Sequence, residues 1–367
     1  MICSYLDRTI AEKAPRDANG RAAIMKGGRV SRRIFYFCDN RHIYTFGIFA
    51  AFYAREIAPA LRLVPYQALG RIRTFPAGAY IFTDFDRLET GELGRLAQLV
   101  DDFEGRGRLV LNHPSRSLGR FDLLRALHTQ GLNVFNVYRL AEWHLAKRFP
   151  VFIRAEKGHR RPFTGLLPDA SALQREAEAL WNRGDAVSDL MIVEFGNARG
   201  VDGKFRKYSA YRVGNEIYGQ HCFANRHWWI KYSGNDFGET GREEHLRYVA
   251  ENPHRAQLER IFELASIEYG RIDYCVVNGA VQTFEINTNP TVLQVTSARR
   301  GDMSPYARLH EDALTALLER VPDTGPLINP MFKGGPVAIA DRVGVNVIEY
   351  VKKKWPQAAP SAPIPSE

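Results

Sequence analysis

Three oxygen-bearing side chains in one short stretch of the sequence have the types and spacing of a metal site. Asp273 lies in a predicted strand, and Glu285 and Asn287 lie in the strand predicted to follow it. Residues two apart on a strand point to the same face, so Glu285 and Asn287 can bind one ion together. Carboxylate and amide oxygens, without Cys or His, suit Mg²⁺ or Mn²⁺ better than Zn²⁺.

The turn between the two strands should bring these side chains together. Asn278-Gly279 lies between apolar runs, and an Asn-Gly pair in that setting is a strong signal for a β-hairpin. The hairpin would return the chain so that Asp273 lies beside Glu285 and Asn287. Magnesium bound in this way usually sits on nucleotide phosphates, so these residues predict the use of ATP.

Size, composition and cysteine content indicate the class of protein. At 367 residues, with 25% charged and 45% hydrophobic residues, the chain is typical of a soluble globular protein with two or three domains or subdomains. Its longest apolar run, Phe46 to Ala54, is far shorter than a membrane span. No secretory signal is recognised, and the four cysteines form no CxxC pair. These features favour a reduced, cytoplasmic compartment and no membrane partner.

The net charge of +9 has two interpretations. It can indicate affinity for anions such as nucleotides, acidic metabolites or nucleic acid, or it can reflect a basic surface in solvent. The basic residues are spread along the chain, which favours the second interpretation. There is no long Lys/Arg block and no aromatic-basic RNA signature, so nucleic acid is not an expected partner.

The first elements of the chain alternate between strand and helix. Strands are predicted at Arg33–Cys38, Leu63–Pro65, Ala79–Thr83 and Arg108–Asn112, with helices at Phe46–Leu61 and Gly91–Phe103. This alternation predicts a small parallel α/β domain over residues 31–111, after a flexible tail at 1–30. No glycine-rich phosphate fingerprint follows the first strand, so a dinucleotide site is not expected there.

From residue 112 the pattern changes. Strands are predicted at Phe149–Ala155, Asp189–Phe195, Lys207–Val213 and Glu216–Phe223, with helices at Leu118–Gln130, Ser171–Asn182, most of His245–Tyr269, and Tyr306–Val321. Gly214-Asn215 joins two of these strands as a hairpin. A further helix is predicted at Val345–Lys354, within a C-terminal extension at 326–355, and a disordered proline-rich tail at 356–367.

The order of these motifs resembles the ATP-grasp superfamily, whose members include glutathione synthetase, D-alanine–D-alanine ligase and ribosomal-protein glutamate ligases. The matching order is the strand FPVFIR, a loop, the strand MIVEF, a hairpin, and then Asp273 with Glu285-Ile286-Asn287, over roughly residues 108 to 322. The resemblance implies an α/β fold with α+β subdomains. A pre-ATP-grasp domain would occupy 31–111 and an ATP-grasp domain 112–325, with a lid subdomain at about 148–195.

The resemblance also implies roles for individual residues. It assigns Asp273, Glu285 and Asn287 to Mg²⁺, and it places Arg154 and Arg120 where relatives usually have lysines against the phosphates of ATP. Arginine keeps the positive charge but is not interchangeable with lysine. A basic loop at 157–161 stands where relatives have a glycine-rich lid. The residues implied for the adenine side are Glu194, Phe195, Gly196 and Asn197.

Basic residues near the hairpins complete the candidate site. Arg206 and Arg212 share one face of their predicted strand, and Lys207 shares the other face with Ser209. Two arginines on one face cannot both be buried unpaired, so a triphosphate or a substrate carboxylate would satisfy them. Partial exposure to solvent would explain them without function. Lys207 is expected to bind the nucleotide, and the candidate catalytic cations are Arg212, Lys231 and Arg271.

The activity that the resemblance implies is ATP-dependent ligation of a carboxylate to an amine. The carboxylate attacks the γ-phosphate of ATP, an acyl phosphate forms, ADP leaves, and the amine then displaces phosphate to give an amide. The substrates would be small molecules, amino acids and peptides among them, and relatives are often homodimers. Two alternatives stay open: a phosphotransferase on the same scaffold, and a nucleotide-binding regulatory protein that has lost turnover, since both expected lysines are replaced.

Overall fold

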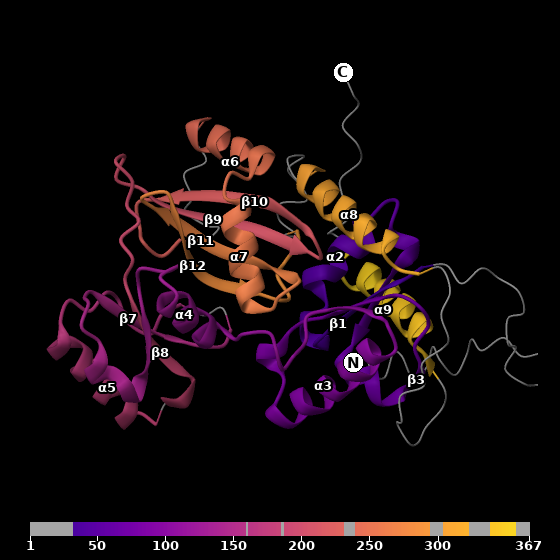
Figure 1. The fold of residues 1–367 in the computed structure, drawn as a ribbon, viewed down its shortest axis with the longest axis horizontal. Coiled ribbons are helices and arrows are strands. Elements are labelled where there is room, and N and C mark those ends of the chain that lie inside the picture. Colours follow the sequence, from indigo (N-terminus) through magenta and orange to yellow (C-terminus); the bar gives the residue numbers. More distant parts are fainter. Residues whose placement is uncertain are drawn as a thin grey trace, which may run out of the picture. The chain divides into compact units, whose positions relative to one another are not determined.

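The computed structural model describes residues 32–158, 161–184, 187–230, 239–293, 304–322 and 338–356. The predicted tail at 1–30 lies outside these residues, as does almost all of the predicted tail at 356–367. The chain divides into two compact units (Figure 1). Unit 1 comprises residues 1–115, 213–216 and 288–367, and unit 2 comprises residues 116–212 and 217–287.

Unit 1 is built on a parallel four-stranded sheet in the order β2-β1-β4-β5. The strands are β1 (Ile34–Cys38), β2 (Leu61–Pro65), β4 (Ala79–Phe82) and β5 (Leu109–Leu111). Every residue of β1, β2 and β4 is buried, as expected for parallel strands that read as continuous apolar runs. Parallel strands need crossover connections, and α2 (Tyr44–Phe52) and α3 (Thr90–Gly105) lie in two of them.

The C-terminal part of the chain also belongs to unit 1. Helix α9 (Ala340–Lys354) packs against β2 and α2, and β13 (Ala338–Ile339) pairs in parallel with β3 (Ile72–Thr74). Helix α8 (Ser304–Glu319) precedes them. The prediction of a helix at Phe46–Leu61 is wrong beyond Phe52, where α2 ends. Pro59 lies instead in a separate 3₁₀ helix, Ala58–Ala60, where a proline in the first turn lacks no needed N–H.

Unit 2 contains two sheets. The first is antiparallel and has the order β6-β8-β7, from β6 (Val137–Arg139), β7 (Val151–Ala155) and β8 (Leu190–Glu194). Helix α5 (Ala170–Asn182) contributes Leu173, Ala177 and Leu180 to a buried cluster that also contains residues of β7 and β8. The strands β7 and β8 were predicted from their apolar runs, and β6 was not.

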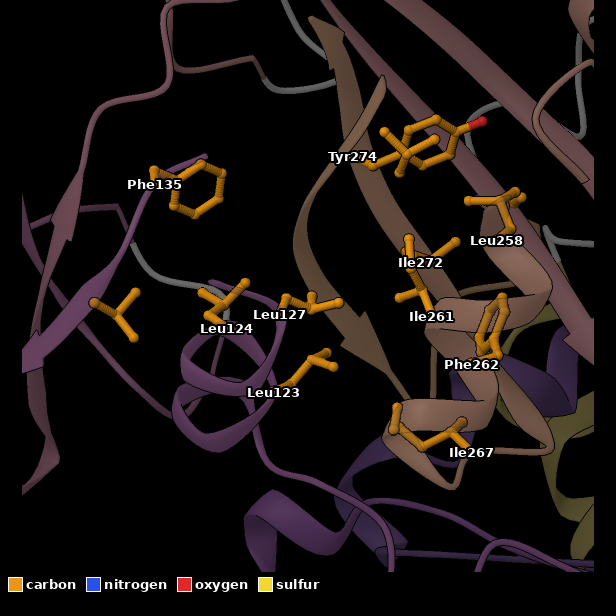
Figure 2. Close-up of a cluster of buried hydrophobic side chains, with 14 of the residues drawn as sticks. Leu123, Leu124, Leu127, Phe135, Leu258, Ile261, Phe262, Ile267, Ile272 and Tyr274 are labelled. Atoms are coloured by element: carbon orange, nitrogen blue, oxygen red, sulfur yellow. The ribbon is translucent and has the colours of Figure 1, made fainter. Parts of the chain in front are cut away.

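The second sheet has the order β10-β9-β11-β12. Its strands are β9 (Phe205–Val213), β10 (Glu216–Asn225), β11 (Tyr269–Val277) and β12 (Ala280–Asn287). The helices α4 (Arg120–Thr129), α6 (Glu239–Glu251) and α7 (Arg255–Ala265) also belong to this unit. Leu127 of α4, Ile261 of α7 and Ile272 of β11 lie in one buried cluster (Figure 2).

The predicted hairpin between β11 and β12 is confirmed. The strands are antiparallel and Val277 pairs with Ala280, which leaves a two-residue turn. Both turn residues have positive φ, 51° at Asn278 and 79° at Gly279, as the common hairpin turns with right-handed twist require. The register places Asp273 directly opposite Glu285.

The predicted α/β class is confirmed by the parallel sheet of unit 1 and the mixed helices and strands of unit 2. Among the residues that the structure describes, none of the helices combines the length and the apolar character needed to cross a membrane.

Candidate active site

A cavity within unit 2 is lined by residues of both of its sheets. Its empty space is about 930 Å³, open solvent at the mouth included, which is the size range of small-molecule sites. Much of the wall is apolar and comes from residues such as Phe152, Met191, Val193 and Phe284. The charged lining residues are Arg154, Glu194, Arg206, Lys207, Asp273 and Glu285.

Glu285 is held by two arginines. Nη2 of Arg154 lies 3.4 Å from Glu285 Oε2, and Nη2 of Arg120 donates a shorter hydrogen bond to the same oxygen. The arginine side chains are only 9% and 10% exposed, and that of Glu285 is 14% exposed. The structure therefore brings together both arginines that were predicted to bind phosphates and one of the predicted metal ligands.

Each of these guanidinium groups retains at least one unused, buried donor. The Nε atoms of Arg120 and Arg154 are buried and have no hydrogen-bond partner among the described residues. A buried donor left unsatisfied costs about 1–3 kcal/mol. Burial, together with the charge of Arg120, lowers the pKa of Arg154 to about 10, with Glu285 acting in the opposite direction. A phosphate oxygen bound at either Nε would satisfy a donor that the protein leaves unpaired.

Asp273 is surrounded by donors from three residues. Ser209 Oγ donates to Oδ1 at 2.7 Å, Arg271 Nε lies 3.0 Å from the same oxygen, and Lys207 Nζ lies 3.2 Å from Oδ2. Burial by itself would raise the pKa of Asp273, but Arg271 and Lys207 outweigh it and hold the pKa far below its ordinary value. Asp273 is therefore ionised at neutral pH.

The donor set suits Mg²⁺ when the metal arrives with an anion. The carboxylates of Asp273 and Glu285 come from directly paired residues, whose Cα atoms are about 5 Å apart in such a ladder. Four cationic side chains contact these two carboxylates: Arg120, Arg154, Lys207 and Arg271. A free divalent cation would add to this positive excess, whereas a metal bound to a polyphosphate would be accompanied by its own negative charge.

The end of β8 forms another part of the cavity wall. Glu194 Oε2 accepts from the backbone N–H of Asn136 at 2.9 Å, and Oε1 accepts from Tyr138 Oη at 2.9 Å. Phe195 and Gly196 also line the cavity. Asn197 is not among the lining residues, and its Oδ1 accepts from the backbone N–H of Arg199 at 3.2 Å. Of the four residues predicted for the adenine side, Glu194, Phe195 and Gly196 therefore line the cavity, and Asn197 does not.

Other predicted cations do not join the cluster around Asp273 and Glu285. Arg212 lies on the face of β9 opposite Lys207, and its guanidinium is 5.9 Å from the ring of Phe262 in α7. Arg206 does line the cavity, but Asp202 and Glu244 of the chain itself pair with it at 2.9 and 2.6 Å. No ligand is needed to satisfy Arg206, which corrects that expectation.

The remaining predicted residues are not found at the cavity among the residues that the structure describes. Asn287 is paired in register with Arg271 and is not among the cavity-lining residues. Lys231 lies outside the described residues, as do His159 and Arg160 of the basic loop. Their candidate roles stay predictions.

Sequence reasoning missed two kinds of residue in the cavity region. Ser209 was placed only as a neighbour of Lys207, although a serine at a strand centre beside a lysine is a signal for a buried hydrogen bond. Trp228 contacts Phe152 and Phe195, with ring centroids 5.0 and 5.8 Å away. These three aromatic side chains line the cavity, so the packing also shapes the wall.

A group of potential metal ligands in unit 1 was not predicted. Asp101, Glu104 and His113 place ligand atoms close enough to hold an ion. However, the backbone N–H of Ser115 donates to Nδ1 of His113 at 3.1 Å, and Nε2 lies 3.0 Å from Asp101 Oδ1. A neutral imidazole that accepts at one nitrogen carries its proton on the other, so His113 offers no lone pair here.

No protein-family model matches this chain, and no curated protein sequence matches it. Among solved structures, the chain is similar to D-alanine–D-alanine ligase from Bacillus anthracis, at 12% identity, 79% coverage of this chain, 99% of that chain, and a TM-score of 0.43. It is also similar to a RimK domain ATP-grasp protein from Sphaerobacter thermophilus, at 15% identity and a TM-score of 0.43. The match covers 77% of this chain and 99% of that chain.

A third similar structure is the ATP-grasp ligase PsnB in complex with a minimal precursor, at 13% identity, coverage of 78% and 99%, and a TM-score of 0.46. Similarity at this level does not assign an activity to this chain.

Proposed function

We propose that this protein is an ATP-dependent ligase that joins a carboxylate to an amine and releases ADP and phosphate. The observation that supports this proposal is the cavity of unit 2. Arg154 and its ion-paired acid, Glu285, line this cavity together with a second ionised acid, Asp273. Arg120 does not line the cavity but also pairs with Glu285, and the Nε atoms of both arginines are buried and unused. Such a cluster beside an apolar wall suits a ligand that has a flat base at one end and phosphates at the other.

In this proposal the cationic side chains bind the phosphates. Arg120 and Arg154 donate through their unused Nε atoms, and Lys207 supplies a further positive charge. Asp273, Glu285 and Asn287 would hold Mg²⁺ or Mn²⁺, which when bound would neutralise charge on the phosphate oxygens. The apolar wall that includes Phe195 and the end of β8 would accept the adenine.

The chemistry needs no covalent nucleophile from the protein. The substrate carboxylate attacks the γ-phosphorus of ATP, and the bond to the β-phosphate oxygen breaks as ADP leaves. An amine then attacks the acyl carbon, phosphate leaves, and the amine loses a proton. Positioning and charge stabilisation account for most catalysis of phosphoryl transfer, and the side chains described above are suited to both.

A second candidate is a nucleotide-binding regulatory protein without turnover. One observation favours it: both arginines that replace the expected lysines pair with Glu285, the residue proposed to bind the metal. Binding of ATP without release of ADP, across mixtures of carboxylates and amines, would support this alternative over the ligase. Release of ADP that requires a carboxylate but no amine would indicate a phosphotransferase.

The first experiment is thermal unfolding with and without Mg²⁺ and ATP. Ligand at about a hundred times its dissociation constant stabilises the folded state by roughly 2.7 kcal/mol, which raises the midpoint of unfolding. The wild type and Glu259→Gln, a control on the exposed face of α7, should both show the increase, and Glu285→Gln should lose most of it. An unchanged wild-type midpoint at millimolar MgATP would contradict the proposal.

Turnover is then tested by ADP release with mixtures of carboxylates and amines. The ligase predicts release that depends on both substrates, together with an amide product detected by mass spectrometry. Asp273→Asn should lower turnover strongly, because it removes one of the two carboxylates that face the phosphates.

A further inference from the structure

We infer that the protein withholds Glu285 from a divalent cation until a polyanion has engaged Arg120 and Arg154. The site would then bind metal only with, or after, the phosphates of the nucleotide. This inference rests on the proposed function and adds to it an order of binding and the residue that enforces the order, Arg120.

Arg120 is fixed to the protein on one side and to Glu285 on the other. Its Nη1 donates to the carbonyl oxygens of Ala155 and Glu156, and its Nη2 donates to the carbonyl oxygen of Gly158 at 3.1 Å as well as to Glu285. A guanidinium is planar, so the positions of these acceptors fix its orientation. Arg120 is therefore held at the carboxylate and does not simply lie near it.

The backbone that anchors Arg120 is itself held in place. Arg139 forms an ion pair with the side chain of Glu156, and the guanidinium of Arg139 lies 3.6 Å from the ring centroid of Phe121. Phe121 is the next residue after Arg120 in α4 and is buried. These contacts connect the start of α4 to the end of β7, so movement of Arg120 away from Glu285 has to break several contacts together.

A free metal ion has to compete with this arrangement. To coordinate Glu285 it would displace two guanidinium donors from Oε2, inside a cluster that already has more cations than carboxylates. The displaced guanidinium groups would be left buried without an acceptor, which is costly. Free Mg²⁺ or Mn²⁺ should therefore bind weakly.

A polyanion removes each of these obstacles. Arg154 and Glu285 line the cavity, so phosphate oxygens that enter it can replace Glu285 as acceptors for the guanidinium groups at its Oε2. Bound phosphate supplies acceptors to both guanidinium groups and reverses the local charge excess. The ion pairs of Arg120 and Arg154 with Glu285 then weaken, and the Glu285 carboxylate becomes available to the metal that accompanies the phosphates.

The test measures binding of Mn²⁺ by the loss of the electron paramagnetic resonance signal of the free ion, without any turnover. MnCl₂ alone is titrated into the wild type, Arg120→Gln and the control Arg125→Gln. Arg125 lies in the same helix and pairs with Glu142, and both of these side chains are 36% exposed. Arg120→Gln should bind Mn²⁺ alone at least about tenfold more tightly than the other two, since a neighbouring positive charge and one competitor for Glu285 are gone.

A second series adds tripolyphosphate to the wild type. Binding of Mn²⁺ to the protein should tighten by about tenfold or more when tripolyphosphate is present, because the arginines are then occupied. Protein-bound metal is separated from free metal–tripolyphosphate by rapid ultrafiltration. This series needs no variant, so it decides the inference even if Arg120→Gln does not fold.

The outcomes separate the inference from the proposed function. If the wild type binds Mn²⁺ alone as tightly as it does with tripolyphosphate, and MnATP also binds, the order of binding is wrong and the nucleotide site stands. If Arg120→Gln folds but gains no affinity for Mn²⁺, Arg120 does not withhold Glu285. If neither MnATP nor Mn²⁺ with tripolyphosphate binds the wild type, both the inference and the proposed function fail.

Discussion

Two clusters of buried acids in this protein have different kinds of partner. In unit 1, Asp84 follows β4, and its Oδ2 accepts from the backbone N–H of Asp39 at 2.9 Å and from Asn289 Nδ2 at 2.6 Å. Tyr36 and Thr45 donate to Oδ1 of the same asparagine. In unit 2, Glu285 and Asp273 are met mainly by guanidinium and ammonium groups, and two of these retain unused donors.

This difference separates a network that stabilises the fold from one that is prepared for a ligand. Backbone and amide donors meet Asp84 at 2.9 and 2.6 Å, whereas its arginine partner, Arg87, lies 3.7 Å away. Neutral donors therefore supply the short contacts of Asp84, and cations supply most of those of Glu285 and Asp273. The cluster of unit 2 keeps surplus cations and unpaired buried donors, which cost stability in the free protein. Surplus charge and unpaired donors of this kind are expected at functional sites, where a bound ligand supplies the missing partners.

The largest effect should come from Asn289→Ala in the network of unit 1. The change removes one donor to Asp84 and the acceptor shared by Tyr36 and Thr45, all buried or nearly so. At roughly 1 kcal/mol for each lost hydrogen bond, unfolding should become easier by about 3 kcal/mol. Differential scanning calorimetry measures this as a lower midpoint, with Asn182→Ala, an exposed residue of α5, as the control.

An unchanged midpoint in Asn289→Ala would contradict the structural role given to the network of unit 1, because the network would then add little to stability. The same role is contradicted if the control loses as much stability as the variant.

In unit 2, Arg154→Gln should weaken the binding of MgATP by about 2 kcal/mol and change the stability of the free protein little. Arg154→Gln removes a charged donor to a bound phosphate, and hydrogen bonds to charged groups contribute roughly 1.5–3 kcal/mol. Binding of MgATP should weaken by more than about tenfold. The free variant should unfold at or above the wild-type midpoint, because it no longer buries a charge with an unpaired Nε. Isothermal calorimetry and thermal unfolding measure the two quantities.

Arg175→Gln, on the exposed face of α5, serves as the control and should change neither quantity. A loss of stability of several kcal/mol in Arg154→Gln, with affinity unchanged, would show that Arg154 belongs with the structural networks and not with the site.

The two clusters also differ in how far the sequence predicts them. The hairpin of Asp273 and Glu285 follows from a local signal, since Asn278-Gly279 meets the positive φ of its turn and fixes the register from Val277 to Tyr274. The pairing of Asp273 with Glu285 needs a shift of register between Asp273 and Tyr274, which no local signal predicts. The partners of Glu285 are 165 and 131 residues away in the chain, and no local pattern connects them. The resemblance placed Arg120 and Arg154 near phosphates but did not predict that both hold a metal-ligand candidate.

Short elements and tertiary pairing account for most of the other misses. The strand β6 has only three residues, too few for a periodic pattern, and it exists because it pairs with β8. Arg212 was assigned to the site because strand alternation gives two faces but does not say which face meets the cavity. The structure shows that Lys207 and Ser209 take the face of Asp273, which leaves Arg212 against α7.

The third prediction concerns pH and the carboxylate of Asp273. Because the folded state lowers the pKa of Asp273, its contribution to stability is fully present above the unfolded pKa of about 3.9 and is lost as pH falls towards the folded pKa. From pH 5 to pH 3 the wild type should therefore lose about 1.3 kcal/mol that Asp273→Asn cannot lose. Urea titrations of both proteins at several pH values measure the difference.

If the difference between the two proteins stays constant from pH 5 to pH 3, the pKa of Asp273 is not lowered in the folded state. The strong cationic surroundings that distinguish unit 2 from unit 1 would then be in doubt.

The smallest effect is expected from the turn that carries the site. Gly279 has a φ of 79° with open space around the position of a Cβ, so Gly279→Ala should destabilise by about 1 kcal/mol through backbone strain alone. Gly203, with a φ of 73° and equally open surroundings, is a matched control in another turn of unit 2.

Both glycine variants should lower the thermal midpoint by similar amounts and leave the affinity for MgATP within about twofold, a change of only about 0.4 kcal/mol. Gly279 is six residues from Asp273, and the end of β11 at Val277 is four residues from it, about 13 Å at the usual rise of a strand, so local strain should not reach the acids. A tenfold loss of affinity in Gly279→Ala alone would instead show that the turn fixes the geometry of the metal ligands. A residue of the turn would then affect binding as well as stability, and the two roles could not be assigned to different residues of this hairpin.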